Sequence, residues 1–170
     1  MPSPADRPVT IAPRKPRPGA IPQPALIVGS AGAAPLVALA ALAWFAPQTE
    51  MKAAAILAVI NYGALLLAFL GAVHWGLAIA AYGAAKRDEV RWAGVVWSVV
   101  PAILAFVAFY PPPRIALIVL IVGHAIAALV DIWAARGGTA PNWYARLRKP
   151  LTLIAMIALG ACVFVRTVPS

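Results

Sequence analysis

Three ionisable side chains interrupt the long apolar runs of this sequence: His74, His124 and Asp131. Ionisable groups are costly inside a bilayer, and they commonly mark ion paths, proton relays or buried ion pairs. Each histidine stands twelve positions before the basic residue that closes its run, Lys86 for His74 and Arg136 for His124. At about 1.5 Å per helical residue, this spacing predicts both imidazoles about 18 Å from those charges, near the bilayer centre.

Two imidazoles at matched depth on neighbouring helices could ligate a b-type haem. Small residues near them would leave room for the macrocycle: Gly71, Gly76, Gly123, Ala127 and Ala128. The alternative is an interhelical hydrogen bond from each imidazole to Asn61, Ser98 or a backbone carbonyl. Two histidines without further ligands are weak evidence for a cofactor, and the single cysteine, Cys162, excludes a multi-cysteine metal site. The hydrogen-bonding interpretation is favoured, so we expect no metal and no cofactor, with haem b as the alternative.

Asp131 follows His124 by seven residues, so both lie on one stripe of a helix, about 10 Å apart. A bare carboxylate in lipid is costly, so we expect Asp131 to face the bundle and to be paired or protonated. It lies five positions before the predicted inner boundary at Arg136. Candidate partners near that boundary are Tyr82, Ser98, Arg148, Lys149 and Thr152. The sequence favours a structural ion pair, and a proton-relay or cation site is the alternative.

The composition indicates which elements hold these side chains. Of the 170 residues, 63% are hydrophobic and 11% are charged, and the mean hydropathy is +0.87. A soluble domain is nearer half apolar and a quarter charged, so lipid must surround most of this chain. Backbone in lipid must be helical, because lipid offers open backbone groups no partner. Five apolar runs therefore predict an all-α, polytopic membrane helix bundle of about five transmembrane helices, at residues 25–46, 53–85, 92–110, 115–135 and 151–165.

Prolines and basic residues predict the domain organisation and the topology. Residues 1–24 contain eight prolines and four basic residues, which predicts a disordered basic tail before a membrane domain at 25–168. Eleven basic residues fall in this tail and after the second and fourth runs, whereas Lys52, Arg114 and Arg166 fall on the opposite side. The positive-inside rule predicts a cytoplasmic N-terminus and an external C-terminus. Because the charges lie between apolar runs, the net charge of +9 does not indicate a nucleic-acid partner.

The segment at residues 137–150 has the most distinctive local pattern. Gly137 and Gly138 are suited to end one helix, and Pro150 can open the next near its first turn. Aromatic and basic residues alternate between them: Trp143, Tyr144, Arg146, Arg148 and Lys149. This pattern predicts a short turn in the inner headgroup layer, which either anchors the chain to lipid or contacts a partner protein.

Two segments carry a family resemblance: Tyr62–Gly76, reading YGALLLAFLGAVHWG, and Pro141–Thr152, reading PNWYARLRKPLT. With the helix order, they resemble the transmembrane protein 69-like family of bacterial and mitochondrial membrane proteins, domain of unknown function 3429. The resemblance covers most of residues 25–166, and the proline-rich tail lies outside it. It implies an all-helical bundle in a bacterial or mitochondrial inner membrane, and it implies no activity. His74 lies in the first motif and Arg148 in the second, whereas His124 lies in neither.

These features predict a non-enzymatic inner-membrane protein that is an accessory or assembly subunit of a larger membrane complex. The expected partners are the lipid bilayer and that complex. The alternative is a small transporter, proton relay or b-haem redox protein that uses His74, His124 and Asp131. An enzyme is not favoured, because only Asp131 and the basic residues at 146–149 come near to a converging set of ionisable groups. The predicted location is the bacterial cytoplasmic membrane, or the mitochondrial inner membrane in a eukaryote.

Overall fold

The computed structural model describes residues 20–84 and 92–166, and within these ranges the secondary structure is entirely helical. Five helices follow one another along the chain: α1 (Gln23–Phe45), α2 (Thr49–Ala84), α3 (Trp92–Val107), α4 (Pro113–Arg136) and α5 (Asn142–Val163).

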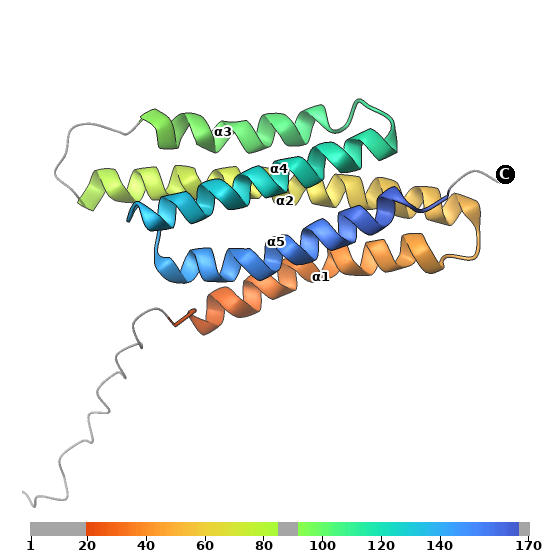
Figure 1. Ribbon diagram of the computed structural model, residues 1–170, viewed down its shortest axis with the longest axis horizontal. Helices are drawn as coiled ribbons and strands as arrows, with labels where there is room; N and C mark the ends of the chain where they lie inside the picture. The colour runs from red at the N-terminus through yellow and green to blue at the C-terminus, as the bar shows by residue number, and fades with distance from the viewer. Residues whose placement is uncertain (1–19, 85–91, 167–170) are drawn as a thin grey trace, which may run out of the picture.

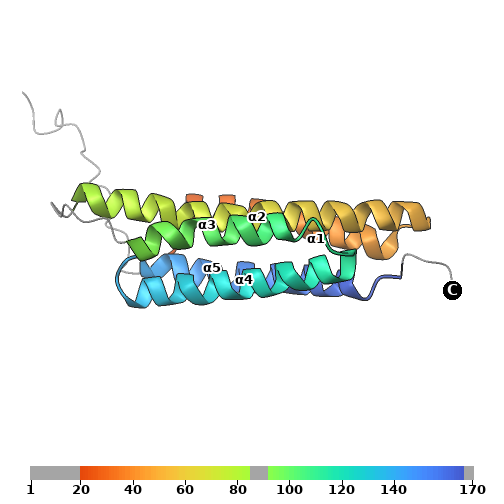
Figure 2. The same ribbon diagram turned by 90° about the horizontal axis from the view of Figure 1, so that it is seen from above.

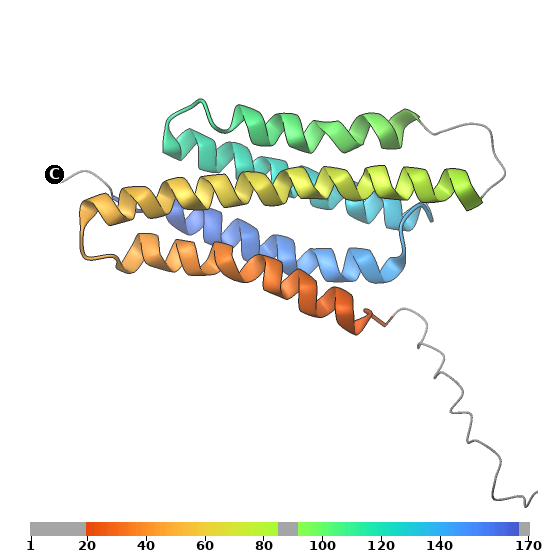
Figure 3. The same ribbon diagram turned by 180° about the vertical axis from the view of Figure 1, so that it is seen from behind.

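The five helices lie side by side along one long axis, and successive helices run antiparallel (Figure 1). Seen at right angles to that view, α1, α2 and α3 form one layer, and α4 and α5 form the other (Figure 2). The longest helix, α2, runs along the whole length of the bundle (Figure 3). We call the end with Gln23 and the connection at residues 137–141 the basic end. The end with the α1–α2 and α3–α4 connections is the hairpin end.

Three helices of the described chain are long and apolar enough to cross a membrane: α1, α4 and the part of α2 at Thr49–Ala80. The third helix contributes a shorter apolar stretch, Gly94–Val107. The fifth is nearly as long as α1, but its first turns carry Arg146, Arg148 and Lys149. The prediction of an all-helical, polytopic membrane bundle is confirmed, whereas the orientation in the membrane stays a prediction.

A proline and a glycine set the two ends of α4. Pro113 is the first residue of α4, where its missing N–H removes no helical hydrogen bond. After α4, Gly138 has a φ of 73°, and the N–H of Thr139 donates to the carbonyl of Ala134 at 2.9 Å. This left-handed glycine turns the chain from α4 into α5.

The largest difference from the predicted boundaries is at α5, which begins at Asn142 rather than at residue 151. The predicted turn at 137–150 is therefore reduced to residues 137–141, and Pro150 lies inside α5. Arg146 and Arg148 are not apolar and so fall outside the apolar run, although arginine is a good helix former. The predicted tail also ends earlier, because α1 begins at Gln23. Residues 1–19 and residue 85 lie outside the described residues.

Leucines and small residues make up the core between the layers. Five leucines are almost completely buried: Leu36, Leu67, Leu117, Leu120 and Leu159. A Cβ on Gly71 would clash with the carbonyl oxygen of Ser98, so α2 and α3 touch there through their backbones. Gly76 and Ala102 are instead exposed on the outer faces of α2 and α3.

Candidate functional site

Asp131 is completely buried in α4 and lies at the centre of the candidate site. It belongs to the buried stripe of this helix, in which Leu117, Leu120, His124 and Ala127 precede it at spacings of three and four residues. Its neighbours on the stripe one turn away are the small Ala127 and Ala134. Their short side chains leave the carboxylate accessible to side chains from other helices.

Both oxygens of the Asp131 carboxylate are bound by side chains from other helices. Nε2 of His74, on α2, lies 2.8 Å from Oδ1, and Nε of Arg148, on α5, donates to Oδ2 at 2.6 Å. The exposed fraction of His74 and of Arg148 is 7% each. The Arg148 guanidinium and the Asp131 carboxylate carry opposite charges, which reduces the cost of burying them together. We call His74, Asp131 and Arg148 the polar cluster; it joins α2, α4 and α5 at one level of the bundle.

Further polar groups near the cluster are buried without a hydrogen bond in the described part of the chain. Tyr144 and Thr152 stand four residues before and after Arg148, on the same face of α5. The Tyr144 hydroxyl, the Thr152 hydroxyl and Nη2 of Arg148 are all unpaired there. On α3, the Trp97 ring meets the His74 imidazole edge-on at 6.4 Å between centroids, and its Nε1 is also unpaired. Buried polar groups of this kind are normally satisfied by water or by a ligand, so the surroundings of the cluster have unused capacity to bind one.

His124 lies at a different level of the bundle. Its Nε2 is 3.1 Å from the carbonyl oxygen of Gly63 on α2, and the side chain is 2% exposed. Gly63 precedes His74 by eleven residues, about 16 Å along the helix. The predicted depth match of the two imidazoles is therefore wrong. The reason is that α2 continues beyond the level at which α4 ends, so counting back from Lys86 placed His74 too far from the basic end.

The residues do not fit a b-type haem between the two histidines. Nε2 of His74 faces Asp131, and Nε2 of His124 faces the Gly63 carbonyl, so the imidazoles address different partners at different depths. The space beside His124 is also filled, since a Cβ on Gly123 would meet the side chain of Leu67 at 2.6 Å. Room for a macrocycle, which the small residues suggested, is not available there.

The polar residues considered as histidine partners are used in other ways. Ser98 donates to the carbonyl of Val95 at 2.6 Å, within its own helix. Asn61 is exposed on the outer surface of α2, and the hydrogen bonds of the two imidazoles go to Asp131 and to the Gly63 carbonyl instead. For His124 the partner is a backbone carbonyl, one of the three kinds of partner that the sequence suggests.

The five residues predicted to contact headgroups or a partner fall on different sides of α5. Arg146 and Lys149 are exposed, Trp143 and Tyr144 are half-buried, and Arg148 is buried against Asp131. Arg148 is therefore not a surface residue. Once the helix begins at Asn142, the i, i+4 spacing places Tyr144, Arg148 and Thr152 on its inward face. That spacing is the sequence signal that distinguishes the buried Arg148 from the exposed Arg146 and Lys149. No sequence pattern indicates the contact of Trp97 with His74 or the hydrogen bond of His124 with the Gly63 carbonyl.

Comparison with known proteins gives a consistent result. The family model described as "Protein of unknown function (DUF3429)" matches residues 21–164, which include all five helices and the polar cluster. Transmembrane protein 69 of Xenopus tropicalis is 36% identical over 144 residues, which is 81% of this chain and 53% of that protein. Transmembrane protein 69 of Mus musculus is 33% identical over 99 residues, 57% of this chain and 38% of that protein.

The chain thus matches about half or less of the length of these two relatives. No solved structure matches it. The match over residues 21–164 agrees with the resemblance seen in the motifs at Tyr62–Gly76 and Pro141–Thr152. The sequence motifs resemble the same family under its other name, the transmembrane protein 69-like family. This helical membrane protein therefore belongs to the DUF3429 family.

Proposed function

We propose that this protein is a non-enzymatic accessory or assembly subunit of a membrane complex, and that a transmembrane helix of another subunit packs on the exposed face of α2. The observation that supports this most is Asn61, which is exposed on the outer surface of that helix. A carboxamide in hydrocarbon has no water to bind and needs a polar partner. The nearest imidazole, His124, faces inward to Gly63, so we infer that the partner of Asn61 comes from another chain.

The depth of Asn61 makes this requirement strong. Gly63, two residues further along α2, contacts His124. His124 is the twelfth of the 24 residues of α4, so about 18 Å of helix extends to either side of it. Asn61 lies only about 3 Å from Gly63 along the helix axis. A side chain as short as asparagine cannot reach the headgroups from that depth.

The same face of α2 carries residues that suit helix packing in a membrane. Leu65, Ala72 and Gly76 follow Asn61 at helical spacing and are all exposed. A Cβ on Gly76 would meet nothing within 4 Å in this chain, so a foreign backbone can approach closely. Small residues and one polar side chain on a helix face are the features that hold transmembrane helices together. We call Asn61, Leu65, Ala72 and Gly76 the α2 face.

The interior supports a structural role rather than catalysis. The Asp131 carboxylate is bound on both oxygens by His74 and Arg148, which links three helices. The pocket at the hairpin end has a volume of about 150 Å³, and one of its eight lining residues is charged. Sites for organic ligands are usually roughly 300–1,000 Å³, with several polar groups that converge on the ligand.

Affinity purification in a mild detergent, at native expression, tests the proposal. The wild-type chain should retain one defined membrane protein. Asn61→Leu and Gly76→Ile should each lower its recovery about tenfold, as expected from the loss of one interhelical hydrogen bond or one close approach. Ala102→Ile, on the exposed face of α3, is the matched control and should change nothing. Equal recovery from all variants, or a lone monodisperse protein from the wild type, would contradict the proposal.

We also propose the bacterial cytoplasmic membrane or the mitochondrial inner membrane as the location, with the N-terminus on the cytoplasmic or matrix side. This rests on the eleven-to-three distribution of basic residues in the sequence and on the family resemblance. Reporter fusions at the two ends of the chain should report opposite compartments. Fusions that report the same compartment would overturn this orientation.

A proton relay at the polar cluster is a second candidate, favoured by the unpaired polar atoms of Tyr144, Arg148 and Thr152 around it. These groups could order water between the cluster and the basic end. Proton flux into proteoliposomes should then fall to background in Asp131→Asn and stay unchanged in Cys162→Ala. Flux equal to that of protein-free vesicles in the wild type would eliminate this candidate. A Soret band in the protein purified after haem-replete expression would show that the chain binds haem after all.

A further inference from the structure

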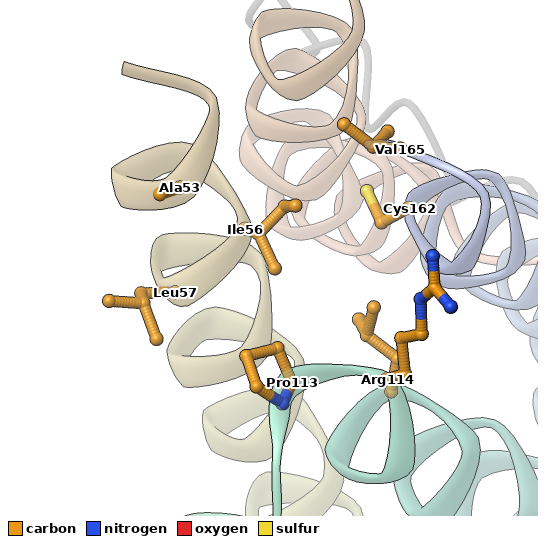
Figure 4. A pocket seen from close by; sticks show the side chains of 8 residues that line it. Ala53, Ile56, Leu57, Pro113, Arg114, Cys162 and Val165 are labelled. Atoms are coloured by element: carbon orange, nitrogen blue, oxygen red, sulfur yellow. The ribbon is translucent and has the colours of Figure 1, made fainter. Parts of the chain in front are cut away.

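The pocket at the hairpin end lies between α2, α4 and α5 and combines an apolar lining with one cation. Ile56 and Leu57 of α2, Leu117 of α4 and Val165 beyond the end of α5 contribute to its apolar lining. Arg114, the second residue of α4, is the one charged residue in that lining. Figure 4 shows its side chain extending from the start of α4 toward Cys162 and Val165.

Two further basic residues are next to lining residues in the sequence. Lys52 precedes the lining residue Ala53, and Arg166 follows the lining residue Val165. With Arg114, these are all three basic residues that the described chain has at the hairpin end, and Glu50 is the acidic residue nearby on α2. The ion pairs of the described residues all involve Asp131, so Arg114 has no carboxylate partner there. The beginning of α4 adds the positive end of a helix dipole beside Arg114.

We propose that this pocket binds an anionic phospholipid of the leaflet at the hairpin end, with its phosphate on Arg114 and the first methylenes of one acyl chain in the apolar hollow. A phosphate group matches the guanidinium in charge and in bidentate geometry. A free phosphate ion would leave the apolar lining unused, whereas a lipid satisfies both parts. The volume of about 150 Å³ accommodates only the start of a chain, so the rest of the lipid lies along the bundle surface.

Photo-crosslinking in nanodiscs tests this assignment. The probe is phosphatidylglycerol with a diazirine near the start of one acyl chain, compared with phosphatidylcholine of identical chains. The adducts should map to the segments 53–57 and 162–165, and phosphatidylglycerol should give about five times more adduct than phosphatidylcholine, the effect of one basic residue near an anionic lipid. Arg114→Gln should remove that preference, whereas Arg146→Gln, an exposed arginine at the basic end, should leave it intact.

Filling the hollow provides an independent variant. Ala53→Phe should lower the adduct yield for both lipids while the far-UV circular dichroism and the elution volume stay those of the wild type. A yield that Arg114→Gln does not change, or adducts spread evenly around the bundle, would overturn the site. A normal yield from a folded Ala53→Phe would show that no acyl chain enters the pocket and would equally overturn it.

Discussion

Replacing Asp131 with asparagine removes the negative charge of the polar cluster and leaves the Arg148 guanidinium buried without a counter-charge. Loss of one partner from a buried ion pair costs about 3–5 kcal/mol. Asparagine has nearly the same size and can still bond to His74, so no cavity adds to this cost. We therefore expect Asp131→Asn to lower the free energy of unfolding by about 3–5 kcal/mol, which is exceptional for a single substitution.

A double-mutant cycle separates this electrostatic effect from general damage. The variant Asp131→Asn/Arg148→Met removes both charges together, so it should be no less stable than Asp131→Asn alone. Equilibrium unfolding in mixed micelles, followed by far-UV circular dichroism, gives the four free energies. Arg146→Met, on the exposed side of the same helix, should stay within about 0.5 kcal/mol of the wild type. A loss below about 1 kcal/mol for Asp131→Asn, or additivity in the double variant, would show that the Asp131 and Arg148 charges do not stabilise each other.

Two further predictions use the same unfolding measurement. Gly71→Ala should lower the free energy of unfolding by about 1–3 kcal/mol, because its Cβ would press on the carbonyl oxygen of Ser98. Gly76→Ala, at an open position, should be neutral or should stabilise by up to about 1 kcal/mol. Equal effects of the two variants would show that α2 and α3 are not in close contact. His124→Leu should cost about 0.6–2 kcal/mol, since it removes one hydrogen bond to Gly63 and no charge. A cost as large as that of Asp131→Asn would indicate an unrecognised role for His124.

The fold class could be predicted from the sequence because the solvent is lipid. In lipid, the backbone of a long apolar run can satisfy its hydrogen bonds only within a helix. The number and order of the helices therefore follow from hydropathy alone. The same criterion fails at α5, where Tyr144, Arg146 and Arg148 precede the apolar run. A helix that begins in the headgroup region is not apolar at its start, and hydropathy therefore places its first residue too late.

The candidate site could be predicted only in part. Burial of Asp131 and its need for a partner followed from the cost of a charge in lipid, and Arg148 was among the partners considered. The contact with His74 could not be found by counting residues, because the count assumed that α2 and α4 end at the same level. In the structure α2 extends further, and the level of each residue depends on how the helices are staggered, which their separate sequences do not encode.

The polar side chains inside the predicted membrane depth differ by the direction in which they point. Those that point inward bind within the chain: Asp131 to His74 and Arg148, and His124 to the Gly63 carbonyl. Asn61 points outward at the level of His124, where hydrocarbon would otherwise surround it. An unpaired carboxamide in lipid lowers the stability of the isolated chain, because no group compensates for its lost hydration. The exposed Asn61 is therefore the observation that most favours the proposed assembly with a neighbouring helix, and the α2 face is where that helix should be sought.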